Sequence, residues 1–148
     1  MRPTLSIFLF ILLVMPAQAQ PRPTLVPNGW TQEFVDRETK TRRFESPDGR
    51  SSLVSRQGLA QRTALGRQMD EIAHQPGERI TYLRRGPSWI AVSGYSGDNI
   101  FYRKSNLACG GKNWHHIELL YPREQKLQMD KTVTFIARAM TKYGDDCG

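Results

Sequence analysis

The sequence lacks most of the motifs that mark enzymes. It has no Gly-x-Ser-x-Gly nucleophile motif, and the glycines after Cys109 lack the spacing and the following helix of a phosphate-binding loop. Two pairs of adjacent carboxylates, at 70–71 and 145–146, are interpreted as solvated charge and not as a glycosidase pair facing across a cleft. These absences favour a protein without catalytic activity.

Long apolar runs are also scarce. The one clear run, residues 5–15, follows a basic start and precedes Ala17-Gln18-Ala19, which has the small-x-small form of a signal-peptidase site. We therefore predict a secretory signal peptide over residues 1–19, cut after Ala19. The run is too short to span a bilayer, and no cysteine lies near the cut to carry a lipid. The mature protein is predicted to be periplasmic or secreted, with no transmembrane segment.

Cysteine occurs only twice, as Cys109 and Cys147. Neither lies in a C-x-x-C motif, so the sequence does not indicate a reactive thiol pair. Because two cysteines in an exported chain usually pair, we predict a disulfide between them. It would close a loop of about 38 residues and stabilise the fold by about 4 kcal/mol in the chain-entropy model.

The chain after the signal peptide has the length of one domain. Residues 20–29 are rich in proline and predict an extended lead-in to a single domain over residues 30–148. The net charge is +7, or +6 once Arg2 leaves with the signal peptide. In an exported protein a basic surface points away from nucleic acid and toward an anionic envelope component or an acidic protein partner. The same charge is also explained by solubility alone.

Hydrophobic periodicity predicts an α+β fold. The turn Pro47-Asp48-Gly49 predicts a hairpin of strands at 41–46 and 51–56, and Trp30, Phe34 and Val35 begin a first strand or an irregular cover. An amphipathic helix is expected over 59–74, ended by Pro76-Gly77. Four strands are then expected at 79–85, 88–95, 99–105 and 114–121. A closing helix is expected from an N-cap at Asp130 through Tyr143.

This order predicts an antiparallel sheet, hairpin plus four-strand meander, with a helix on each face. The residues that carry a family resemblance are 44–50 (FESPDGR), 88–94 (SWIAVSG), 100–104 (IFYRK) and 121–122 (YP). With this layout the chain resembles the PsbP-like α/β/α sandwich and a group of small secreted bacterial proteins of unknown function. The resemblance implies a non-catalytic accessory or assembly factor, but no binding motif of that family maps onto residues here.

The neighbouring histidines His115 and His116 suggest a metal site at first sight. Successive side chains of a strand point to opposite faces, so the two cannot bind one ion together. His116 and Glu118 share a face, but two ligands make an incomplete zinc site. We expect no metal and no cofactor. The alternative function is an envelope hydrolase with a cleft that joins His116, Glu118 and a second polar group.

Basic and aromatic residues alternate in the meander. The residues predicted to bind an anion or a partner are Arg84, Arg85, Arg103, Lys104 and Tyr102. Arginine at strand ends is also typical of solvated sheet edges. The leading hypothesis is a non-catalytic binding or accessory factor of the cell envelope that uses this surface. A third interpretation is an oligomer subunit with an exposed apolar face around Trp30, Phe34 and Trp114.

Overall fold

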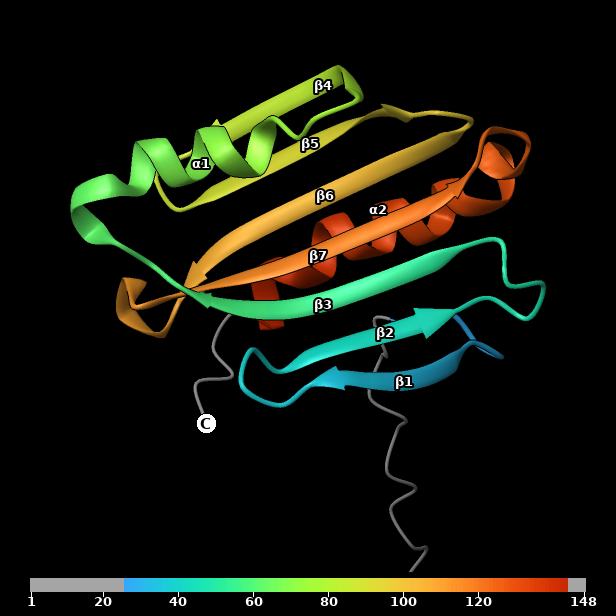
Figure 1. Cartoon of the computed structure of the whole chain (residues 1–148), viewed down its shortest axis with the longest axis horizontal. Helices are drawn as coiled ribbons and strands as arrows, with labels where there is room; N and C mark the ends of the chain where they lie inside the picture. Colours follow the sequence, from blue (N-terminus) through green and yellow to red (C-terminus); the bar gives the residue numbers. More distant parts are fainter. Residues whose placement is uncertain (1–25, 144–148) are drawn as a thin grey trace, which may run out of the picture.

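One antiparallel sheet of seven strands forms the centre of the computed structural model, which describes residues 26–143 (Figure 1). In chain order the elements are β1 (Thr31–Asp36), β2 (Thr41–Glu45), β3 (Ser52–Leu59), α1 (Leu65–Ala73), β4 (Glu78–Gly86), β5 (Trp89–Ser96), β6 (Asn99–Ala108), β7 (Asn113–Pro122) and α2 (Lys126–Tyr143). Short 3-10 turns, Arg62–Ala64, Cys109–Gly111 and Arg123–Gln125, precede α1, β7 and α2. The predicted α+β class, the hairpin, the meander and both helices are confirmed.

The strand order is β1-β2-β3-β7-β6-β5-β4. The hairpin of β2 and β3 therefore extends the meander at its far end, because β3 pairs with β7 over its whole length, with Arg56 opposite His116. The sequence predicted the hairpin and the meander but not the pairing of β3 with β7 that joins them. Strands β1 and β4 are left as the two edges of the sheet.

The predicted ends of the elements shift at three places. Strand β3 continues to Leu59 because residues up to that point pair with β7, so α1 begins at Leu65 and not at residue 59. Helix α2 begins at Lys126, directly after the 3-10 turn that follows Pro122. The predicted N-cap Asp130 is therefore wrong: it lies inside the helix, where its carboxylate accepts a 3.4 Å hydrogen bond from Lys126.

Each face of the sheet is packed against one helix, and the alternation of strand side chains divides the core in two. Helix α2 packs on one face, against the buried residues Phe44, Leu53, Ile100, Tyr102, Ile117, Leu119 and Tyr121. Helix α1 packs on the other face, against the buried residues Ile90, Val92, Phe101 and Trp114. Phe101 and Tyr102 are neighbours in β6 and lie in the two different cores, because successive side chains of a strand point to opposite faces.

Neither helix covers a whole face. In Figure 1, α1 lies in front of β4 and β5, and α2 lies behind β6 and β7. As far as the described residues show, no helix covers the α1 face over the hairpin strands β2 and β3 or the α2 face over β4 and β5. These two open surfaces are where outward-facing side chains can meet a ligand. Within residues 26–143, neither helix has the length and apolar character that crossing a membrane demands.

The oligomer interpretation requires an exposed apolar face, and the two tryptophans expected on it are not exposed. Trp114 is buried under α1, and Trp30 is partly buried against the core of the α2 face. The Phe34 side chain, the predicted signal peptide and Cys147 lie outside the described residues. Cys109 begins the 3-10 turn between β6 and β7. Because its predicted partner Cys147 lies outside the described residues, the disulfide stays a prediction.

Candidate functional site

The register of the sheet divides the five residues predicted to bind a partner. Arg84 stands opposite Ala91, which stands opposite Lys104, so these residues share the α2 face with Tyr102. Arg85 and Arg103 are their direct neighbours in the chain and therefore lie on the α1 face. The structure does not bring the five residues to one surface.

Arg103 is an internal residue whose charge is already paired. Its side chain is only 3% exposed. Nη2 donates to Glu78 Oε1 at 2.6 Å, Nε donates to Glu118 Oε2 at 2.6 Å, and Nη1 donates to the backbone carbonyl of Ile72 at 2.7 Å. Burial alone would lower the pKa of Arg103, but the hydrogen bonds to the two glutamates raise it. The guanidinium thus joins the end of α1, the start of β4 and strand β7.

Lys104 and Tyr102 are also internal. The Lys104 ammonium donates a 2.5 Å hydrogen bond to the backbone carbonyl of Ala137 in α2, and burial lowers its pKa. Tyr102 belongs to the core under α2. Burial, together with the neighbouring Tyr82, raises the pKa of Tyr102 to about 12. Both residues hold α2 against the sheet.

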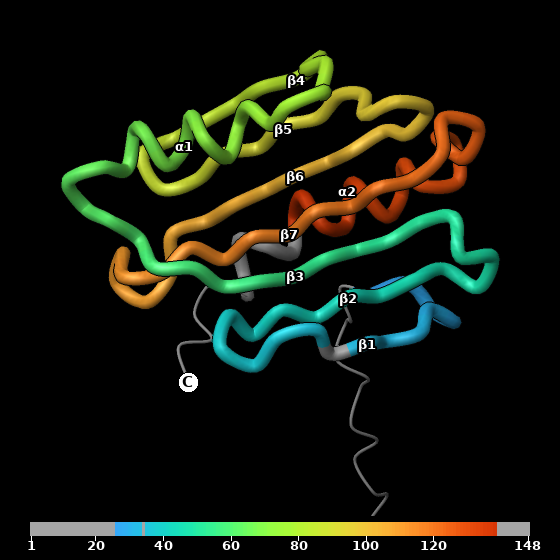
Figure 2. Tube along the Cα trace, in the orientation of Figure 1, coloured from blue at the N-terminus to red at the C-terminus, as the bar shows by residue number. Residues whose placement is uncertain are grey.

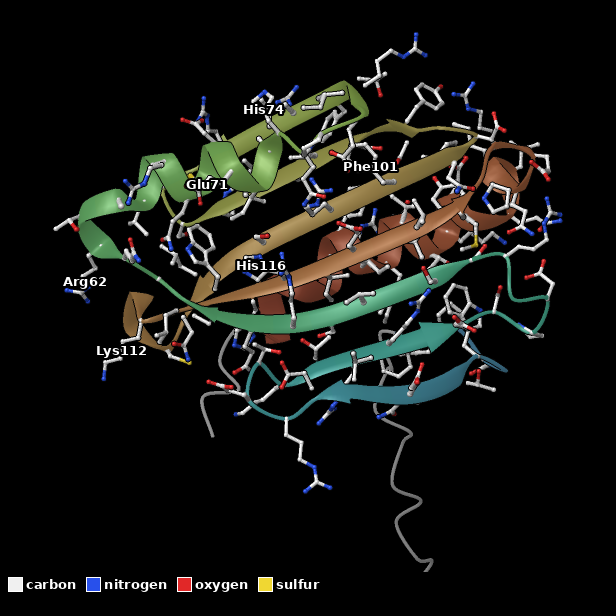
Figure 3. All side chains as sticks on the ribbon, viewed as in Figure 1. Arg62, Glu71, His74, Phe101, Lys112 and His116 are labelled. Atoms are coloured by element: carbon white, nitrogen blue, oxygen red, sulfur yellow. The ribbon has the colours of Figure 1, made fainter. Side chains whose placement is uncertain are left out.

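His116 and Glu118 lie on the open part of the α1 face, and the structure places His115 on the opposite face. Arg56, His116 and Glu118 line a cleft of about 720 Å³ that reaches from the first three strands to Gln75, just after α1. Figure 3 shows His116 at the centre of this face, with Glu71 on the helix beside it. Burial, and then the charge of Arg56, lowers the pKa of His116 to about 4.

His116 and Glu118 in this cleft already have partners within the protein. His116 Nδ1 lies 2.7 Å from Ser105 Oγ, and its ring stacks on Trp114 with 6.3 Å between ring centroids. Ser105 is fully buried, so its hydroxyl has no access to a substrate. Glu118 is bound by Arg103. Within residues 26–143, no three His, Cys, Asp or Glu side chains come close enough to hold a metal ion. The histidine of the cleft is neutral and the Glu118 carboxylate is paired with Arg103, which is a weak basis for acid–base chemistry.

A different set of basic and aromatic residues faces outward on the α2 face of β4 and β5. The guanidinium carbons of Arg79 and Arg123 lie 4.8 and 4.2 Å from the ring centre of Tyr95. Tyr82, which is 46% exposed, and the exposed Arg84 continue the row along β4. We call these five residues the Tyr95 surface.

Two arginines of this surface, Arg79 and Arg123, were not among the predicted binding residues. Arg79 reaches the α2 face because a β-bulge between Ile80 and Tyr82 shifts the register of β4 by one residue. In a regular strand Arg79 would face α1. Arg123 follows Pro122 at the end of β7, and its Nη2 donates a 2.8 Å hydrogen bond to the carbonyl of Gly97. Neither the bulge nor this contact leaves a signal in the local sequence.

Comparison with known proteins gives no relative: no protein family, curated protein or solved structure matches the chain. The resemblance to PsbP-like proteins therefore stays a prediction.

The Arg103 contacts predict a large loss of stability when the guanidinium is removed. Replacing Arg103 by Leu leaves the Glu78 carboxylate buried without a partner, and we expect the free energy of unfolding to fall by about 3–5 kcal/mol in urea titrations. Arg85→Leu is the matched control, because it removes only an exposed pair with Asp70 and should cost less than about 1 kcal/mol. Equal midpoints for Arg103→Leu and the unchanged protein would show that the network is not structural.

His116 predicts a loss of stability in acid. Its pKa is about 4 in the folded protein, below the ordinary histidine value of 6.5, so the unfolded chain takes up a proton first as the pH falls. The contribution of the neutral histidine is intact above pH 6.5 and is lost as the pH falls toward 4, by at most about 3 kcal/mol. We expect His116→Asn to flatten this part of the stability–pH curve. The exposed His74→Asn is the comparison variant, and a stability–pH curve that His116→Asn does not alter would refute the assignment.

Proposed function

We propose that the protein is a non-catalytic binding or accessory factor of the cell envelope that holds an anionic partner on the Tyr95 surface. The observation that carries this proposal is the state of its three arginines. Among the ion pairs of residues 26–143, none includes Arg79, Arg84 or Arg123. Their charges are thus available to a ligand, unlike that of Arg103.

The surface is also partly ordered before any ligand binds. Two of its guanidinium groups rest on the ring of Tyr95, and Arg123 is fixed further by its bond to Gly97. Side chains that are already immobilised lose less conformational entropy when they bind. A guanidinium stacked on an aromatic ring still presents its N–H edge, which matches a carboxylate or phosphate group. This geometry supports an anionic ligand with acidic groups on its surface.

The predicted signal peptide sets the compartment in which such a ligand would be met. Outside the cytoplasm, anionic lipid head groups, cell-wall phosphates, acidic polysaccharides and acidic proteins are the available classes. The alternative, an envelope hydrolase acting through His116 and Glu118, is less well supported. Its carboxylate is bound to Arg103, and the hydroxyl that bonds the histidine belongs to the buried Ser105.

The test is co-sedimentation of the mature protein with cell-wall sacculi and with anionic lipid vesicles, and titration with poly-glutamate, at low and moderate salt. We expect salt-sensitive binding to at least one of these anions, weakened at least about tenfold by Arg79→Gln/Arg123→Gln, because each lost charge-assisted hydrogen bond is worth about 1.5 kcal/mol or more.

The matched control is Arg37→Gln/Arg42→Gln. It removes the same charge from exposed residues near the other edge of the sheet and should bind as the unchanged protein does. Binding to none of the three anions, or equal weakening in both double variants, would contradict the proposal.

A further inference from the structure

The Tyr95 surface ends at β4, and β4 is an edge of the sheet. Strand β4 pairs with β5 on one side only. Figure 2 shows it at the margin of the sheet, on the side away from β1. Within residues 26–143, no further strand pairs with its outer side, which leaves a row of backbone N–H and C=O groups facing outward. Such an edge can bind an extended segment as an additional strand.

The charges of β4 decide which segment fits. Arg79, Arg84 and Arg85 lie along this one strand, and the whole chain carries a net charge of +7. Two copies of β4 brought edge to edge would place arginines of the same sign beside each other, which is destabilising in a sheet. A second copy of the chain is therefore disfavoured, and an acidic segment is favoured by charge complementarity.

The register of β4 also gives the spacing of the acidic groups. Because of the bulge, Arg79, Tyr82 and Arg84 follow one another on the α2 face. A strand added beside them would present every second side chain to this row. Acidic residues would stand next to the two arginines, and an apolar or aromatic residue next to Tyr82. On the other face, Leu83, 39% exposed, would meet an apolar residue.

We propose that β4 binds an extended acidic segment of a partner protein, which adds to the sheet as a further strand. This inference rests on the proposed function, because it assigns the anionic partner of the Tyr95 surface to protein. The recognised pattern is acidic-x-aromatic-x-acidic, where x is apolar. The backbone hydrogen bonds of β4 supply affinity, and the two arginines on the α2 face select the charge.

The test uses a labelled peptide, Thr-Glu-Val-Tyr-Val-Glu-Thr, and the same peptide with alternate backbone nitrogens methylated, in both alternating patterns. Methylation keeps every charge and removes half of the N–H donors. Alternate N–H groups of an added strand point toward β4, so one of the two methylation patterns removes the donors that pair with β4. We expect the unmodified peptide to bind, to protect amides of β4 from hydrogen exchange, and to bind at least tenfold more tightly than the more weakly binding methylated form. Arg84→Gln should weaken binding severalfold, whereas Arg37→Gln/Arg42→Gln should not.

Each other outcome is decisive. Equal binding of all three peptides, without protection of β4, would overturn strand addition and leave a purely electrostatic surface. Binding to sacculi or anionic vesicles without binding to the peptide would keep the proposed function and overturn the protein partner. Binding to none of these probes would overturn both.

Discussion

The buried guanidinium of Arg103 is the contact on which the arrangement of this fold depends. A charged group removed from water is tolerated only when its partners are in place, and breaking such a buried pair leaves an uncompensated charge. Arg103 draws those partners from three elements: the last turn of α1, the first residue of β4, and β7. One side chain of a central strand therefore ties both α1 and the start of the edge strand β4 to the sheet.

Two neighbouring cations in β6 each form a hydrogen bond to one of the two helices. Arg103 bonds a carbonyl of α1 on one face, and Lys104 bonds a carbonyl of α2 on the other. Because each helix covers only part of its face, two surfaces stay open, and they differ in character. In the cleft on the α1 face, the histidine and Glu118 are bonded to Ser105 and Arg103. The arginines of the Tyr95 surface form no ion pair with a described carboxylate, and two of them stack on one aromatic ring, which is why we assign binding to the α2 face.

The sequence predicted local structure well and long-range structure poorly. The turn at Pro47-Asp48-Gly49 and the period of two in the meander depend on neighbours in the chain, and the strands they predicted are present. The pairing of β3 with β7 joins residues far apart in sequence, and nothing in either strand specifies it. The opposite faces of His115 and His116 were predictable for the same local reason.

The predicted binding residues show the same limit. Arg84, Arg85 and Arg103 are equivalent in the sequence, yet the first faces outward on the α2 face, the second pairs with Asp70, and the third is buried. Arg103 is paired with Glu78, which lies 25 residues away in the sequence and is brought beside it by the fold. Arg79 was missed because a single bulge turned it to the other face.

The most direct measurement is native-state hydrogen exchange of Glu78→Gln beside the unchanged protein. This substitution keeps the shape of the side chain and removes one of the two charges that Arg103 faces. If Arg103 holds α1 and the start of β4 on the sheet, amides in α1 and β4 should exchange faster, while those of α2, β3 and β7 stay protected. Unchanged exchange in α1 and β4, or equal acceleration in every element, would contradict that role.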